Sequence, residues 1–279
     1  MYVRRNRACC RNRATVIIGC LLPLVAAVAW SDEGEINKQR RLEFIRATLS
    51  RFEAEAIGEP VKQLTLSAEP ALWYTNPIRS ATGTGATFFW LDGDRPVAAI
   101  SASIRDGGSV FRELSLLQDT PLRVTRDDTE VWTPKALAKP WAVVPEAPQP
   151  ANNSSLRLIQ MRSIVRRFET NLLKDDMKSG ALRALTQPIY RYMDKAAGVL
   201  DGAVFAFVEA TDPETLLLLE AHADDVPGAW RYTLARMTSR PSQVLLDGRE
   251  HWETIGYWRN PRSIEDPYSE AHDSQYEER

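Results

Sequence analysis

Cysteine is almost absent from this chain, because Cys9, Cys10 and Cys20 are the only three among 279 residues. All three lie within the first 20 positions, so the rest of the sequence has no thiol. This excludes disulfide bonds, cysteine nucleophiles and thiolate metal sites from the remainder of the chain. We therefore expect the folded part to be held by its hydrophobic core alone, and about 250 residues are enough to build one.

Histidine is scarce too, and His222, His251 and His272 do not have the spacing of paired metal ligands. His222 lies among acidic residues, which allows a cation site or a general base, but a solvated acidic turn is the simpler interpretation. The sequence also lacks the motifs of serine hydrolases, zinc proteases and nucleotide-binding loops. We predict no metal site and no cofactor, and the sequence favours a non-enzymatic protein.

Long apolar runs are confined to the N-terminus, where Ala14–Ala29 follows five arginines and ends in the small residues Ala27-Val28-Ala29. A basic start, a short apolar run and a small-residue cleavage site are typical of a secretory signal peptide, here residues 1–29. An uncleaved N-terminal anchor is the alternative, and it is the only membrane contact that the sequence indicates. We expect an exported protein, periplasmic or extracellular.

The charge of the exported part is acidic. Five of the 35 basic residues lie in the signal segment, so 30 remain against 37 acidic residues, a formal charge of −7. This balance argues against nucleic acid as a partner. We predict an envelope protein or a polysaccharide as the partner.

Two apolar stripes with helical spacing lie 116 residues apart. They consist of Leu42, Ile45, Leu49, Phe52 and Ala56 in the first copy, and Leu158, Met161, Val165, Phe168 and Leu172 in the second. Each stripe predicts one long amphipathic helix, over Arg41–Ala56 and from Leu158 to about Lys174.

A hairpin pattern is also written twice. Asp201–Ala221 predicts two apolar strands around a turn at Ala210–Pro213, and Gly85–Ile100 follows the same plan. The pattern Val-x-x-Asp-x-x-Glu-x-Trp then closes each copy, at residues 124–132 and 244–252. We interpret this self-similarity as a tandem duplication. His251 departs from it, because the first copy has Val131 at that position.

The predicted fold class is α+β, with each unit made of one long amphipathic helix and about four antiparallel strands, as in cystatin-like or NTF2-like folds. The units span 36–132 and 156–258, and a proline-rich linker at 133–155 joins them. Residues 259–279 are predicted to be a disordered charged tail. One continuous sheet around a pseudo-two-fold axis is the alternative arrangement. Trp141 is unusual in a linker and is expected to dock on a domain.

Three segments of the second copy, Leu182–Tyr192, Asp201–Ala221 and Leu245–Glu250, resemble a group of exported proteins of planctomycete-type bacteria. The resemblance spans most of the exported chain. It implies a cell type, and it implies no activity, cofactor or catalytic residue.

Glu130 and Glu250 are the best matched acidic residues of the two copies. They indicate an alternative function, an envelope glycan hydrolase that uses Glu130 or Glu250 as acid or base, although a cross-strand ion pair is the simpler interpretation. Trp132 and Trp252 lie two residues away, and Trp73 precedes the first hairpin. These three tryptophans are candidate sugar-binding residues, with a place in the core as the alternative.

Overall fold

The computed structural model of the protein describes residues 22–75, 83–174, 177–223, 228–259 and 262–277. Most of the predicted signal peptide lies outside these residues. The chain divides into two compact units, Met1–Arg40 and Arg41–Arg279. The helix α1 (Leu22–Leu49) begins in the first unit and ends in the second. None of the described helices combines the length and the apolar character needed to cross a membrane.

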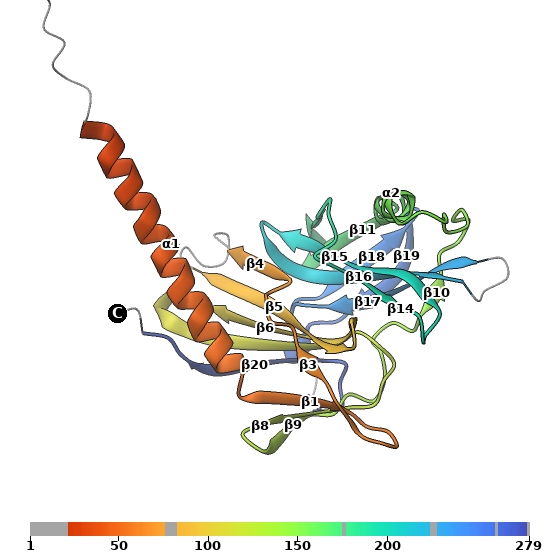
Figure 1. Ribbon diagram of the computed structural model, residues 1–279, viewed down its shortest axis with the longest axis horizontal. Coiled ribbons are helices and arrows are strands. Elements are labelled where there is room, and N and C mark those ends of the chain that lie inside the picture. Colours follow the sequence, from red (N-terminus) through yellow and green to blue (C-terminus); the bar gives the residue numbers. More distant parts are fainter. Residues whose placement is uncertain (1–21, 76–82, 175–176, 224–227, 260–261, 278–279) are drawn as a thin grey trace, which may run out of the picture. The chain divides into compact units, whose positions relative to one another are not determined.

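The second unit is mostly β, so the α+β prediction is wrong. Among the described residues the chain forms two α-helices and 20 β-strands, arranged in four antiparallel sheets (Figure 1). The helices α1 and α2 (Ser154–Val165) each precede one half of the unit. We call the part from Arg41 to Val143 the first half and the part from Ser154 to Gln275 the second half.

The predicted long helices end midway along their apolar stripes. The strand β1 (Phe52–Ala56) follows α1, and β11 (Phe168–Lys174) follows α2. Phe52 and Ala56 are four residues apart, and this spacing suits a strand as well as a helix. The deciding pattern is the alternation within β1, where Phe52 and Ala54 are buried and Glu53 is exposed. The same stripe thus continues on one face of a strand.

Each half contains a small and a large sheet. In the first half the small sheet has the order β2-β1-β8-β9, and the large one has the order β20-β7-β6-β5-β3, with β4 also paired to β5. The bounds are β2 (Lys62–Gln63), β3 (Thr65–Leu66), β4 (Leu72–Thr75), β5 (Thr84–Asp92), β6 (Arg95–Ile104), β7 (Ser109–Leu116), β8 (Leu122–Arg126), β9 (Thr129–Trp132) and β20 (Tyr268–Gln275), with a short 3-10 helix at Asp106–Gly108.

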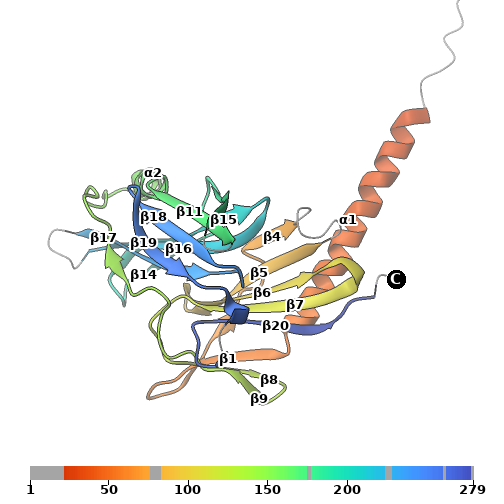
Figure 2. The ribbon, with the colours of Figure 1, turned by 180° about the vertical axis from the view of Figure 1, so that it is seen from behind.

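The second half repeats these orders as β12-β11-β18-β19 and β10-β17-β16-β15-β13, with β14 also paired to β15 (Figure 2). The bounds are β10 (Ala142–Val143), β12 (Met177–Ala181), β13 (Arg183–Ala184), β14 (Tyr190–Asp194), β15 (Val199–Glu209), β16 (Asp212–His222), β17 (Ala229–Arg236), β18 (Ser242–Leu246) and β19 (Arg249–Thr254), with a short 3-10 helix at Tyr257–Arg259.

The two halves exchange their last strands. The strand β10 is the last strand of the first half in the chain but pairs with β17 of the second half. The strand β20 is the last strand of the second half but pairs with β7 of the first half. The prediction of a disordered tail at 259–279 is therefore wrong for Tyr268–Gln275, and part of the predicted linker is a strand. Trp141, next to β10, packs against the core clusters of the unit.

Matched residues of the two halves make matched contacts. Tyr74 lies over Gly85 on the neighbouring strand, and Tyr192 lies over Gly202 in the same way. A Cβ atom on either glycine would lie 2.4 Å from the tyrosine ring, so only glycine fits beneath it. This recurring contact supports the interpretation that the halves are copies of one pattern.

Three clusters of buried apolar residues form the core. One belongs to the first half and packs the end of α1 on its sheets, and one belongs to the second half around α2. The third joins the two large sheets, because Phe89 and Ala99 of the first half share it with Val204, Ala206 and Leu216 of the second. The two halves therefore share one core, which agrees with the grouping of Arg41–Arg279 into one compact unit.

Candidate functional site

The structure does not bring Glu130 and Glu250 together. Glu130 lies on β9 and Glu250 on β19, in two different sheets, and both side chains are exposed. Glu130 lines a pocket with Glu53 and Glu55 of β1, whereas Glu250 accepts a hydrogen bond from Gln243 at 2.7 Å. Two carboxylates that act on one glycosidic bond must lie within about 10 Å of each other in a shared cleft. The described pocket that Glu130 lines does not include Glu250.

The tryptophans proposed as sugar-binding residues belong to the core. Trp132 is fully buried, and its Nε1–H donates to the backbone oxygen of Asp266 at 2.7 Å. Trp252 is 9% exposed, and Trp73 is partly buried against the first-half core. Trp132 has no exposed ring face for stacking, whereas Trp252 packs in the second-half core and also borders a pocket of about 360 Å³.

His222 is engaged by a neighbouring acid. Its Nε2 lies 2.9 Å from Glu220, which also accepts from Arg95 and Tyr192. Among the residues that the structure describes, no three His, Cys, Asp or Glu side chains are arranged to hold a metal ion. The acidic turn beyond His222, at 224–225, lies outside the described residues.

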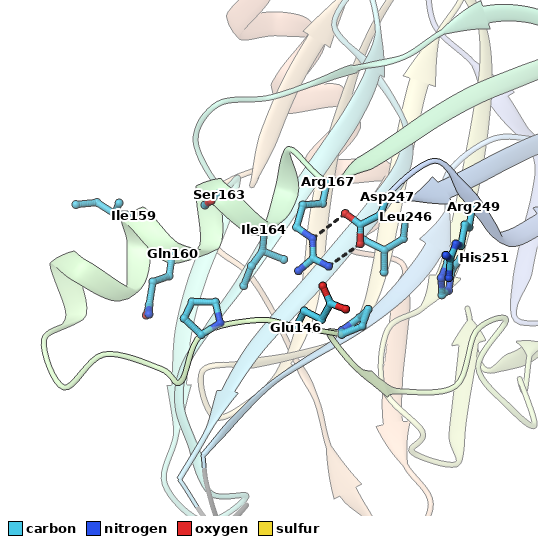
Figure 3. A pocket seen from close by; sticks show the side chains of 12 residues that line it. Glu146, Ile159, Gln160, Ser163, Ile164, Arg167, Leu246, Asp247, Arg249 and His251 are labelled. Atoms are coloured by element: carbon cyan, nitrogen blue, oxygen red, sulfur yellow. Dashed lines mark hydrogen bonds and ion pairs between the residues drawn. The ribbon is translucent and has the colours of Figure 1, made fainter.

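A groove of about 690 Å³ is the best candidate for a binding site. Three segments form it: the proline-rich segment after β10, one face of α2, which follows that segment in the chain, and the distant β18–β19 hairpin (Figure 3). The lining residues are Pro145, Glu146, Pro148, Ile159, Gln160, Ser163, Ile164, Arg167, Leu246, Asp247, Arg249 and His251.

The walls of the groove are fixed by hydrogen bonds. Gln160 of α2 accepts from the backbone N–H of Ala151 at 2.8 Å and donates to the backbone oxygen of Gln149 at 2.8 Å. These bonds hold the proline-rich segment beside the helix. Because its carbonyls and N–H groups are satisfied there, this wall stays in place without a ligand.

The hairpin wall is held by an ion pair. The Arg167 Nε and Nη2 atoms donate to Asp247 at 2.9 and 2.6 Å, as the dashed lines in Figure 3 show. Asp247 has a positive φ of 52° in the turn, which aspartate tolerates. The hydrogen bond raises the pKa of Arg167 and lowers the pKa of Asp247. The pair is charged at neutral pH and closes one side of the groove.

The groove has an apolar end and a cationic end. Ile159 is 59% exposed at the first end of the groove, which Pro148 and the buried Ile164 also line. Arg249 and His251 lie side by side on β19 at the other end, as Figure 3 shows. Among the described residues Arg249 forms no salt bridge, so its guanidinium is available to a ligand.

The fold itself does not require these groove residues. The matching positions of the first half are Glu43 for Ile159, Thr129 for Arg249 and Val131 for His251, as the strand registers and the conserved offset show. By contrast, the ion pair between Arg167 and Asp247 recurs between Arg51 and Asp127. The ion pair is thus part of the scaffold, whereas Ile159, Arg249 and His251 are specific to the second half.

Sequence reasoning missed the groove because its walls come from three separate segments. One signal was present, since His251 departs from the repeat. Ile159 and Arg249 depart from it as well, so comparing the halves position by position would have identified the surface.

Comparisons with known proteins add no relative. No protein-family model, curated protein or solved structure matches this chain, so the resemblance to exported proteins of planctomycete-type bacteria stays a prediction.

Proposed function

We propose that this is an exported, non-enzymatic binding protein of the cell envelope. Its groove binds an extended segment of a partner protein that carries an apolar side chain near an acidic one. The observation that carries this proposal is the exposure of Ile159 in the same groove as the guanidinium of Arg249. The export itself is inferred from the basic and apolar N-terminal segment.

The chemistry of the two ends defines the occupant. An apolar side chain of the partner would cover Ile159, and each 100 Å² of apolar surface removed from water contributes about 2.5 kcal/mol before ordering is counted. The guanidinium of Arg249 matches a carboxylate with two parallel N–H donors. A groove closed by α2 and a hairpin suits an extended peptide better than a folded surface.

The test uses fluorescein-labelled peptides in which Leu, Ile or Phe is followed within two residues by Asp or Glu, and a second set with Lys instead of the acid. Fluorescence anisotropy of the protein with each set measures Kd. We expect saturable binding of the acidic set at micromolar to high-micromolar Kd and weaker binding of the lysine set.

The variant Ile159→Glu should weaken binding at least tenfold, because it places a carboxylate at the apolar end. Leu156→Glu is the matched control, since Leu156 is 53% exposed on the same helix but does not line the groove. Arg249→Glu should reverse the preference between the peptide sets. The proposal would be refuted if Leu156→Glu weakened peptide binding as much as Ile159→Glu does. It would also be refuted if no peptide gave saturable binding.

A further inference from the structure

Two glutamates lie opposite each other where the exchanged strand β20 pairs with β7. Glu113 of β7 and Glu270 of β20 are direct partners in the antiparallel register. Glu270 is 3% exposed, and Glu113 is partly buried with its carboxyl turned away from solvent. Like charges directly opposite each other destabilise a strand pair. A pair of acids is therefore an unexpected choice at this place.

The hydrogen bonds of the pair leave one oxygen unsatisfied. Tyr268 Oη donates to Glu113 Oε1 at 2.5 Å, and Arg105 Nη2 donates to Glu270 Oε1 at 3.0 Å. Glu270 Oε2 is buried and has no hydrogen-bond partner among the described residues. A protonated Glu113 would supply a donor for this oxygen, which is otherwise left desolvated.

A small cavity adjoins the pair. It has a volume of about 40 Å³ and is lined mainly by oxygen-bearing residues, including Ser103, Asp212 and Ser239. This volume and its polar lining are sufficient for one water molecule beside the pair.

Further charged and titratable groups surround the pair from every neighbouring element. They are Tyr268 on β20, Tyr74 on β4, Arg105 after β6, Asp212 and Glu214 on β16, and Arg236 on β17. Burial and the negative charge of Glu270 raise the pKa of Glu113 well above its ordinary value. The acids outnumber the two arginines around it, so the site favours a bound proton.

The other half shows that the fold does not demand acids here. In the exchanged strand β10 the corresponding partners are Ala142 and Tyr232. The same cross-strand position is therefore neutral in one half and carries two carboxyl groups in the other.

We propose that Glu113, opposite Glu270, binds a proton and forms a pH-sensitive latch, which holds β20 on β7 while the proton is bound and releases it when the proton is lost. The docked state binds one proton more than the released state over the pH range between the ordinary and the raised pKa of Glu113. Raising the pH through this range therefore weakens the docking of β20, by up to tenfold per pH unit.

Hydrogen exchange of the full chain, followed by mass spectrometry between pH 6 and 10 and corrected for the intrinsic exchange rates, tests the latch. We expect the amides of Ser269–Gln275 to lose protection as the pH rises, while those of β16 keep theirs. Glu113→Gln keeps an amide donor for Glu270 without a titrating group, so the protection of β20 should no longer depend on pH. Glu130→Gln, which removes an exposed carboxylate, is the control and should behave like the wild type.

Protection of β20 that does not change with pH in the wild type would overturn the proposal, as would an unchanged slope in Glu113→Gln. Parallel loss of protection in β16 would also overturn it, because that result means global unfolding. If Glu113→Gln does not fold, Glu270→Gln decides: a flattened pH dependence supports the latch, and a wild-type slope refutes it.

Discussion

The ion pair between Arg95 and Glu220 links the two halves and allows a quantitative test of the fold. Glu220 of β16 is 1% exposed and accepts from Arg95 Nε and Nη2 at 3.0 and 2.9 Å. It also accepts from Tyr192 Oη at 2.7 Å and lies 2.9 Å from His222 Nε2. Replacing Arg95 by Met removes both of its hydrogen bonds to Glu220 and keeps an unbranched, uncharged side chain.

Removal of one partner from a buried pair leaves an uncompensated charge, which destabilises a protein by about 3–5 kcal/mol. The remaining contacts of Tyr192 and His222, and the 21% exposure of the Arg95 side chain, place the expected loss at the lower end, about 3 kcal/mol. Glu220→Gln should cost less, about 1–2 kcal/mol, because the partly exposed guanidinium can be solvated. The double variant should therefore be more stable than the sum of both losses implies, by about 1–2 kcal/mol.

Urea unfolding followed by tryptophan fluorescence provides the free energies, since several buried tryptophans report on both halves. Arg51→Met is the control, because it breaks the matching type of pair at an exposed site and should leave the midpoint nearly unchanged. Strict additivity of the two single variants would show that Arg95 and Glu220 do not interact, and would refute this account of how the halves are joined.

Two further predictions use the same assay. Gly202→Ala should destabilise the protein by about 1–3 kcal/mol, since the new methyl group would lie 2.4 Å from the Tyr192 ring. Gly180→Ala is the control and should have little effect, because the space around Gly180 is open. Equal effects of the two substitutions would contradict the close contact. For the pH dependence, burial alone would raise the pKa of Glu220, but its bonds to His222, Arg95 and Tyr192 lower it overall. The stabilisation by the ionised Glu220 is therefore present above the ordinary pKa of a glutamate, 4.5, and is lost as the pH falls below it. The difference in unfolding free energy between the wild type and Glu220→Gln should shrink between pH 5 and 3. A constant difference would contradict the lowered pKa.

The sequence predicted that the two halves repeat one pattern, and it predicted the wrong secondary structure where the spacing of apolar residues fits both a helix and a strand. The matched positions Gly85 and Gly202 were visible as repeats, and the structure shows the tyrosine that each accommodates. The apolar stripes were taken as helices throughout, because Phe52 and Ala56 satisfy a helix period and a strand period at once. Only the exposed Glu53 between buried neighbours distinguishes them.

The strand β20 was missed for a different reason. Its buried positions hold Tyr268 and Glu270, and Asp273 follows them, where a typical strand has aliphatic side chains. Its composition is therefore typical of a disordered segment. Asp273 is held by Arg126 at 2.8 Å, an interaction that joins residues far apart in the sequence. Local pattern analysis cannot detect a strand that is stabilised by distant charges.

The exchange of β10 and β20 determines when each half can be completed during synthesis. The bond between Tyr268 and Glu113 joins residues 155 positions apart, so the first large sheet keeps an open edge at β7 until β20 has been synthesised. A nascent chain that stops after β19 would expose that edge to other chains. Conversely, two separately produced fragments, cut between β10 and α2, would each carry the strand that the other lacks, and they would find their native partner by strand complementation.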